Sequence, residues 1–241
     1  MPVRHTPEAP TGVRPLPGGG LIDAHRHDDH QIAYPRQGVI SITTDAGTWV
    51  APGNRALWIP AGTVHEHRAY GRTDLRLIGL GENPLNLDRP AVLAVTPLLR
   101  ELIVACSEEP DDPLLRAVLL DRLRRAPAPE RPVHLPAARD PRLAAVCAMV
   151  VADPAGERTL PELAAAAGTS DRTLARLCRA EFGMTFPQWR AQFRLHHALV
   201  LLAEGAQVTT VAHQCGWSSA SAFIDAFRRV FGHTPGRAFH T

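Results

Sequence analysis

The sequence contains little cysteine, and its four cysteines are not arranged for a disulfide framework or a thiolate zinc site. They lie far apart and no CxxC pair occurs. We therefore expect buried, reduced thiols. Residues 1–20 are rich in proline and glycine and lack the apolar core of a signal peptide, and no apolar run is long enough to span a bilayer. These absences favour a soluble, cytoplasmic protein.

The chain contains no lysine, and all 26 of its basic residues are arginine. We attribute this bias to a GC-rich genome. Residues 139–241 carry 11 arginines against 8 acidic residues, whereas residues 1–138 carry 15 against 16. The C-terminal part is therefore mildly basic but has no polybasic arm, so charge alone does not establish nucleic-acid binding. A chain of 241 residues is long enough for two modest domains.

The last eighty or so residues contain one unit twice. The positions that return are Leu163-Ala164, Gly168, Leu174 and Phe182-Gly183, matched by Val211-Ala212, Gly216, Phe223 and Phe231-Gly232. A short helix, a glycine turn and a second amphipathic helix form a helix-turn-helix. Two copies in one chain predict two recognition helices that enter successive major grooves of DNA, about 34 Å apart.

The first unit has the richer set of candidate base-reading side chains. Ser170 is the expected N-cap of a helix over 171–181 whose inner side is apolar. Arg172, Thr173 and Arg176 fall on its outer side near the helix start, and arginine pairs well with guanine edges. We expect these three residues to read bases, and Ser170 and Arg179 to contact phosphates.

The second unit is poor in arginine on its outer side. Ser218 or Ser219 is expected to cap a helix over 220–230, with Phe223, Phe227 and Phe231 inward. Ser221 and Asp225 are its base-reading candidates, although Asp225 could instead orient a neighbouring arginine. Between the units, a long helix over 187–204 would fix their spacing. The expected phosphate contacts from these two segments are Ser219, Arg228, Arg229, Arg190 and Arg194.

These motifs resemble the signature of the AraC/XylS family of transcription regulators over roughly residues 140–241. The matching segments are Gly183-Met184-Thr185-Phe186, Gly216-Trp217-Ser218-Ser219, Phe227-Arg228-Arg229 and Gly232-His233-Thr234-Pro235. The resemblance implies a bacterial, sequence-specific regulator that binds promoter DNA as a homodimer and contacts RNA polymerase if it activates. Trp217 stands where phenylalanine is commoner in the family.

The first eighty residues show a different sequence pattern, one that is typical of short β-strands and turns. β-branched residues over 39–43, a turn at 45–47 and a further apolar run over 48–50 predict a hairpin. Closely spaced proline and glycine after it are typical of a small barrel or sandwich. From 91 to 126 the apolar period becomes helical, and the stripe that includes Leu115 and Leu119 is a candidate self-association surface.

The predicted fold class is therefore α+β and multi-domain: a β-barrel, a helical segment and an all-α double helix-turn-helix. We expect a flexible N-terminus over 1–20, a sensor domain over 21–90, a helical dimerisation segment over 91–126, a proline-rich linker over 127–138 and a DNA-binding domain over 139–241. Asp140-Pro141 marks the start of its first helix.

Histidines in the predicted sensor resemble the two motifs of the cupin barrel. His25, His27 and Gln31 correspond to the first motif and His65 to the second. Residues i and i+2 of a strand share a face, so His25 and His27 can converge. Gln31 replaces the usual glutamate and Ala69 the asparagine. The resemblance implies a site for one divalent Zn, Ni, Fe or Mn ion, walled by Tyr34, Trp49, Trp58 and His67.

Three interpretations of this cluster remain open at this point. It binds a metal, it lines a pocket for an organic effector, or it is a remnant or a catalytic site. The main hypothesis is a one-component transcription regulator without enzymatic activity. A metal-dependent cupin enzyme fused to a DNA-binding module is the alternative, and Gln31 argues against it because an amide is a weaker ligand than a carboxylate.

Overall fold

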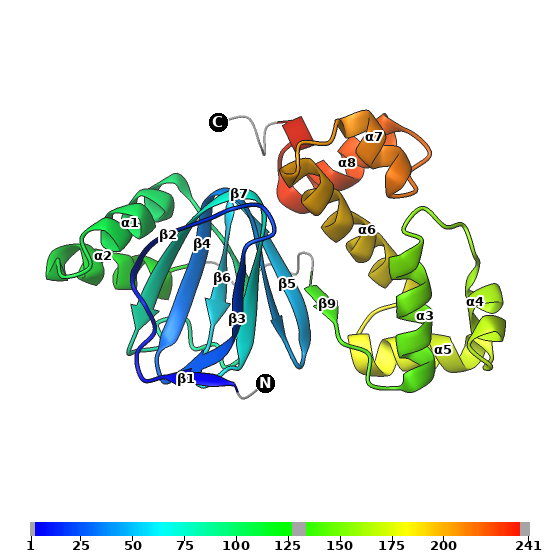
Figure 1. Cartoon of the computed structure of the whole chain (residues 1–241), viewed down its shortest axis with the longest axis horizontal. Coiled ribbons are helices and arrows are strands. Elements are labelled where there is room, and N and C mark those ends of the chain that lie inside the picture. The colour runs from blue at the N-terminus through cyan, green and yellow to red at the C-terminus, as the bar shows by residue number, and fades with distance from the viewer. Residues whose placement is uncertain (1–2, 127–133, 237–241) are drawn as a thin grey trace. The chain divides into compact units, whose positions relative to one another are not determined.

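The computed structural model describes residues 3–126 and 134–236 and divides the chain into two compact units (Figure 1). The N-terminal unit is rich in β-sheet, and the C-terminal unit is almost entirely helical. This confirms the predicted fold class, with one correction. Among the described strands the hydrogen-bonded order does not return to its starting point, so the sheet is open and not a closed barrel.

Two long strands organise the N-terminal sheet. β4 (His30–Thr44) and β7 (His65–Leu80) pair antiparallel along most of their length. β7 also pairs with β3 (Leu21–His27) near its start and with β2 (Gly12–Leu16) near its end. The remaining strands of this unit are β1 (Arg4–Thr6), β5 (Gly47–Pro52), β6 (Arg55–Ile59) and β8 (Ala91–Ala94). Because β4 and β7 each pair with several other strands, the sheet curls around an apolar interior (Figure 1).

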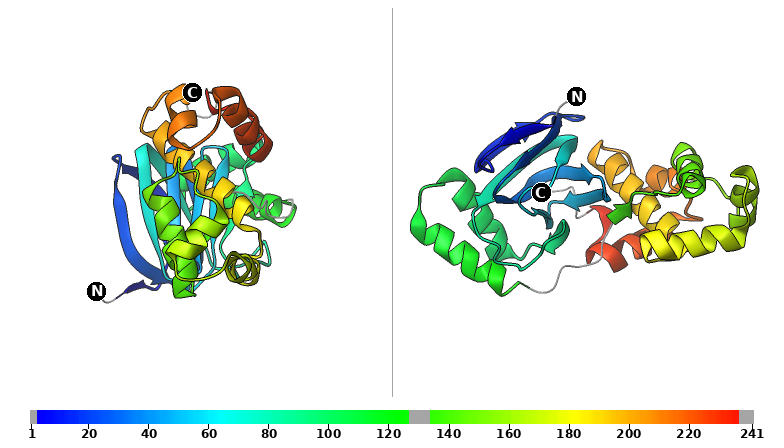
Figure 2. Two further views of the ribbon diagram at one scale, coloured as in Figure 1. Left: turned by 90° about the vertical axis from the view of Figure 1, so that its right-hand side faces the viewer. Right: turned by 90° about the horizontal axis from the view of Figure 1, so that it is seen from below.

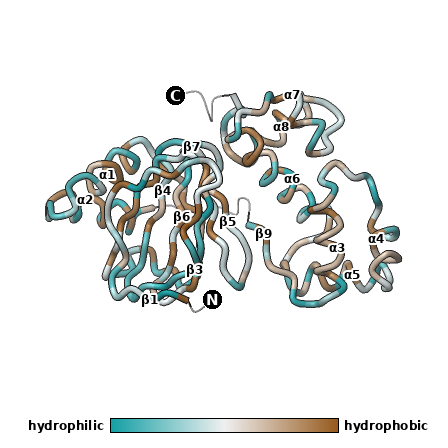
Figure 3. The backbone as a smooth tube through the Cα atoms, in the orientation of Figure 1, coloured by the Kyte–Doolittle hydropathy of each residue, from teal (hydrophilic) through white to brown (hydrophobic). Residues whose placement is uncertain are grey.

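The strands are buried on both faces. Ile40, Ile42, Leu57 and Leu75 lie in the interior cluster. The alternate positions Ile32, Tyr34, Trp58 and Ile78 belong to a second cluster, formed with the helices that cover the outer face. Burial on both faces explains the nearly continuous apolar character of the strands, and Figure 3 shows hydrophobic segments recurring along the sheet.

Helices α1 (Pro97–Glu108) and α2 (Pro113–Arg124) form this outer cover (Figure 2). The buried guanidinium of Arg76 on β7 donates to Glu108 Oε1 at 2.6 Å, which ties α1 to the sheet. Leu119 is fully buried against its own sheet, and Leu115 packs beside it. The predicted self-association role is therefore wrong for Leu119, because the chain itself covers it, whereas for the half-buried Leu115 it stays a prediction.

Two predicted boundaries also differ from the structure. The segment over 1–20, predicted to be flexible, contains β1 and β2. It is held by non-local hydrogen bonds, including the one that the Gly79 amide donates to the side-chain Oγ1 of Thr11 at 2.9 Å. β8 joins the sheet from within the predicted helical segment. Of the predicted linker, residues 127–133 lie outside the described residues, and β9 (His134–Pro136) follows them.

The helical unit follows the predicted order of elements. Asp140 caps α3, and Ser170 and Ser219 cap the second helix of each repeat, as expected. Gly168 and Gly216 have φ of 65° and 75°, which explains why glycine occupies both turns. A π-helical turn η1 (Cys178–Phe182) extends α5. The helices are α3 (Pro141–Ala152), α4 (Leu160–Ala166), α5 (Asp171–Leu177), α6 (Phe186–Ala203), α7 (Val208–Gln214) and α8 (Ala220–Phe231).

Each repeat has its own apolar core. Leu174 and Phe182 pack with α3 and the start of α6 in the first. In the second, Phe223, Phe227 and Phe231 are buried in succession along α8, as predicted. No helix within the described residues is long and apolar enough to cross a membrane.

Candidate histidine centre and nucleic-acid interface

Three histidines of the N-terminal sheet converge. His25 and His27 lie on β3, and His65 lies on β7 directly opposite His25 in the strand register. One ring nitrogen from each residue lies within 4.8 Å of those of the other two. The ring centroids of His25 and His65 are 4.3 Å apart, and those of His27 and His65 are 5.1 Å apart. The structure thus brings together three of the four predicted ligand positions.

Backbone carbonyls fix the orientation of all three imidazoles. His25 Nδ1 lies 2.8 Å from the Asp23 oxygen, His27 Nδ1 2.6 Å from the Asp29 oxygen and His65 Nδ1 2.9 Å from the Thr63 oxygen. A carbonyl only accepts, so each Nδ1 carries the hydrogen and each Nε2 presents a lone pair. Nε2 of His27 and of His65 is buried and makes no hydrogen bond to the described residues.

Burial favours the neutral imidazole at His25 and His65, and at the neighbouring His67. Removal from water lowers the pKa of His65 to about 3, and burial likewise lowers the pKa of His25 and places that of His67 well below its ordinary value. Neutral imidazole is the form that binds a metal ion. The sequence could not reveal the supporting carbonyls, since every residue type carries one.

The other predicted pocket residues divide between the two faces of the sheet. His67 pairs in register with Ile42, and Gln31 pairs with Ile59, so both side chains lie on the interior face, where Trp49 also packs. Tyr34 and Trp58 belong to the outer cluster, so their predicted place beside the histidines is wrong. The Tyr34 hydroxyl donates to the Gly53 carbonyl, and the Trp58 ring stacks on His30.

The first recognition helix presents unpaired arginines. Arg172, Arg176 and Arg179 are exposed on α5 and η1, and none of their guanidinium groups pairs with a carboxylate among the described residues. Thr173 is half-buried, and its hydroxyl lies 3.0 Å from the Ser170 hydroxyl. This side of the helix combines positive charge with free donors, as direct reading of base edges requires.

The second recognition helix differs in charge. Ser221 and Asp225 are exposed on α8, and Asp225 Oδ1 lies 3.4 Å from the Arg228 guanidinium. This ion pair favours the predicted orienting role of Asp225 over direct contact with cytosine. Arg229 is exposed beside it, and the Ser219 hydroxyl accepts from the Ala222 amide as the helix cap.

Arg194 is placed differently from its prediction. Its guanidinium donates to the carbonyls of Pro154, Gly156 and Gly216 at 3.0–3.2 Å. It therefore braces the interior of the helical unit and is not the outward phosphate contact that the polar side of the helix suggested. Arg190 is half-buried and donates to the Arg158 carbonyl at 2.6 Å.

Both units are similar to families of known proteins. Residues 20–124 match the AraC-like ligand binding domain, and residues 163–240 match a helix-turn-helix domain. The chain is 32% identical over 221 residues to the HTH-type transcriptional regulator NimR of Escherichia coli K12, a match that covers 88% of this chain and 80% of that protein.

Other similarities are confined to part of the chain. The HTH-type transcriptional regulator RipA of Corynebacterium glutamicum is 39% identical over 111 residues, which cover 46% of this chain and 32% of RipA. The solved DNA-binding domain of the transcriptional factor AdpA, in complex with a target DNA, is 33% identical. It covers 40% of this chain and 87% of its own, with a TM-score of 0.38.

Proposed function

Because the chain belongs to the AraC family of transcriptional regulators, with a ligand-binding unit followed by a helix-turn-helix DNA-binding region, we propose that its effector is a divalent transition-metal ion. The observation that carries this proposal is the convergence of three imidazoles whose Nδ1 atoms are engaged by carbonyls. In metal sites, such a bond to the second nitrogen fixes the tautomer and the ring.

His25, His27 and His65 would hold the ion through their Nε2 atoms. Imidazole donors suit Zn, Ni and Fe, whereas Mn favours oxygen ligands. The interior side chain of Gln31 has a buried Oε1 that makes no hydrogen bond to the described residues, so this oxygen is a candidate for a further ligand. A bound ion would add positive charge and link β3 to β7. Hydrogen bonding of an organic effector by the same imidazoles is the competing hypothesis.

Metal binding is proposed to control the affinity for DNA and not to support catalysis. The support for a non-enzymatic role is that NimR, a relative whose match covers 88% of this chain, is a transcriptional regulator. An ion can act on DNA binding only if its affinity differs between two states of the protein. We place this activity in the cytoplasm, where a bacterial regulator meets its promoter.

The test of this function is the dissociation constant for DNA with and without metal. A duplex selected from a random pool by the full chain serves as probe, and fluorescence anisotropy measures binding in Zn²⁺ or in excess chelator. Coupling of ordinary strength predicts a change of about 5- to 150-fold. Equal dissociation constants for Zn²⁺, Ni²⁺, Fe²⁺ and Mn²⁺ and for chelator would contradict a metal effector.

We also propose how the two recognition helices divide their tasks. Arg172, Thr173 and Arg176 read bases in one major groove, while the second helix contributes Ser221 and an Asp225 that orients Arg228. Charge on the exposed arginines supports this division, because α5 and η1 keep their arginines unpaired. The proposed phosphate contacts are Ser170, Arg179, Ser219, Arg228 and Arg229.

Homodimerisation is proposed to use the outer side of α2. Leu114 and Val118 are 76% and 44% exposed and lie four residues apart, so they form an apolar stripe. Replacing both with glutamate should convert dimers to monomers, measured as mass by light scattering. The matched control is Val151→Glu, an exposed apolar position on α3 that is 56% exposed. An unchanged dimer in the double variant would place the interface elsewhere.

A further inference from the structure

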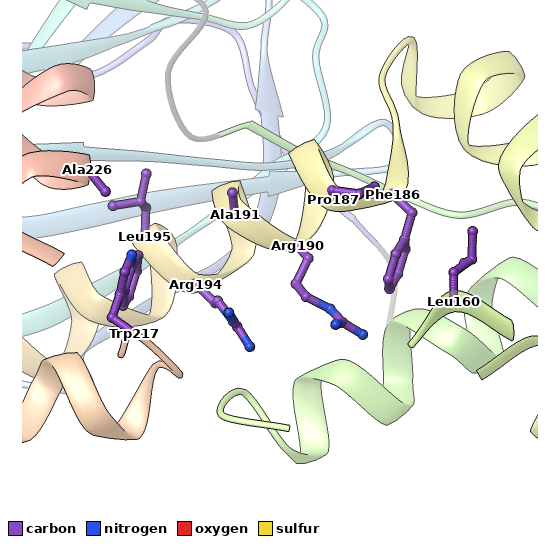
Figure 4. Close-up of a pocket in the computed structure, with 9 residues that line it drawn as sticks. All are labelled: Leu160, Phe186, Pro187, Arg190, Ala191, Arg194, Leu195, Trp217 and Ala226. Atoms are coloured by element: carbon purple, nitrogen blue, oxygen red, sulfur yellow. The ribbon is translucent and has the colours of Figure 1, made fainter. Parts of the chain in front are cut away.

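The helical unit contains a pocket of about 340 Å³ along α6 (Figure 4). Its walls are mostly apolar and include Leu160, Phe186, Leu195 and Trp217. Arg190 and Arg194, one helical turn apart on α6, both point from the helix into the same region (Figure 4). The pocket is large enough for a small organic molecule and combines an apolar lining with a few polar groups, as ligand sites do.

The two arginines form an uncompensated positive centre. Neither pairs with a carboxylate among the described residues, and both donate only to backbone carbonyls. Nε of Arg190 is buried without a hydrogen-bond acceptor, and its guanidinium carbon lies 4.6 Å from the centre of the Phe186 ring. Burial and the neighbouring Arg194 lower the pKa of Arg190, in agreement with the absence of a carboxylate partner among the described residues.

We propose that this pocket is a second effector site, which binds a small aromatic or aliphatic carboxylate. The carboxylate would accept hydrogen bonds from Arg190, and the apolar part would lie between Phe186 and Trp217. Arginine and carboxylate form strong charge-assisted pairs when partly shielded from water. A DNA phosphate would satisfy the charge as well, but it would leave the apolar walls without a partner.

Binding at this site would loosen the connection between the two helix-turn-helix units. Arg194 joins the carbonyls of Pro154 and Gly156, which precede the first unit, to the carbonyl of Gly216 at the turn of the second. A carboxylate beside these donors competes with the carbonyls. The ligand should therefore weaken DNA binding, independently of the histidine centre.

The test is calorimetric titration of the full chain with 2-naphthoate, with 2-naphthalenemethanol as the neutral analogue. We expect a dissociation constant of about 1 mM or tighter for the acid and at least about 10-fold weaker binding for the alcohol. The variant Arg190→Met keeps the aliphatic stem and removes the charge. It should weaken the binding of 2-naphthoate to a similar degree. The control is Arg139→Met, an exposed arginine of the same unit.

A second variant guards against misfolding of the first. Ala191 is exposed on α6 and borders the pocket, so Ala191→Leu should fill it without disturbing the helix. We expect this variant to keep its affinity for DNA and to lose the binding of 2-naphthoate. Absence of naphthoate binding, or equal binding by Arg190→Met, would overturn the proposal. A salt dependence of DNA binding reduced in Arg190→Met, without naphthoate binding, would make Arg190 a phosphate contact instead.

Discussion

Replacing His65 with alanine will lower the affinity of the full chain for Zn²⁺ by at least about 100-fold. Loss of an outer partner of a metal ligand alone costs about 10- to 100-fold, and loss of the ligand itself should cost more. His65 is the residue that connects the two strands, since its ring lies 4.3 Å from that of His25 and 5.1 Å from that of His27. Competition with a chelating indicator dye measures the change.

The matched control for this variant is His30→Ala. His30 lies three residues after His27 in sequence, but its ring stacks on Trp58, away from the three converging nitrogens. It should therefore retain the affinity of the parent chain. Far-ultraviolet circular dichroism establishes that both variants fold. Parental Zn²⁺ affinity in a folded His65→Ala variant would remove this residue from the site.

Replacing Arg176 with alanine should cost about 1–3 kcal/mol of binding free energy at one base pair, or about 5- to 150-fold in affinity. Arg176 is exposed, belongs to the last turn of α5 and has no carboxylate partner in the described parts of the chain, so its donors are available to guanine O6 and N7. Arg172→Ala should act similarly at a neighbouring base pair. Selection from a random DNA pool, followed by sequencing, gives the preference at each position.

Arg179→Ala is the comparison that separates base reading from phosphate contact. Arg179 is exposed on η1, beyond the end of α5. Loss of this arginine should weaken binding to all DNA sequences about equally. It should also reduce the slope of the logarithm of the binding constant against the logarithm of the salt concentration by about one. If Arg176→Ala instead keeps the parental sequence preference at every position, Arg176 does not read a base.

The helical unit could be predicted closely because its signals are local. Asp140, Ser170 and Ser219 cap helices within three residues of themselves, and Gly168 and Gly216 mark turns through their own backbone conformation. The starts of α3, α5, α6 and α8 agree with the predicted ones to within one residue, whereas the helix predicted over 171–181 consists of α5 and then η1. By contrast, the partners of Arg194 lie 22–40 residues away and are backbone carbonyls, which leave no trace in the sequence.

In the sheet, pairing between segments that are distant in the sequence determines which residues form strands and which face each side chain occupies. Local sequence patterns did not predict these features. β2 pairs with residues 73–77, about sixty positions later, and the glycine and proline among its five residues obscure the strand signal. Burial of β4 and β6 on both faces removes the alternation that would have assigned Tyr34 on β4 and Trp58 on β6 to the outer face. His25, His27 and His65 were predictable from their spacing, whereas the carbonyls that orient them were not.

The most direct test of the account is the metal content of the purified full chain, measured by mass spectrometry after loading with Zn²⁺ and removal of free ions. Three converging imidazoles with engaged Nδ1 atoms, two of them buried, should retain about one ion per chain, and the His65→Ala variant should retain almost none. Less than about a tenth of an ion per chain in the parent, with Zn²⁺ or with Ni²⁺, Fe²⁺ and Mn²⁺, would contradict the account and leave the histidines to an organic effector.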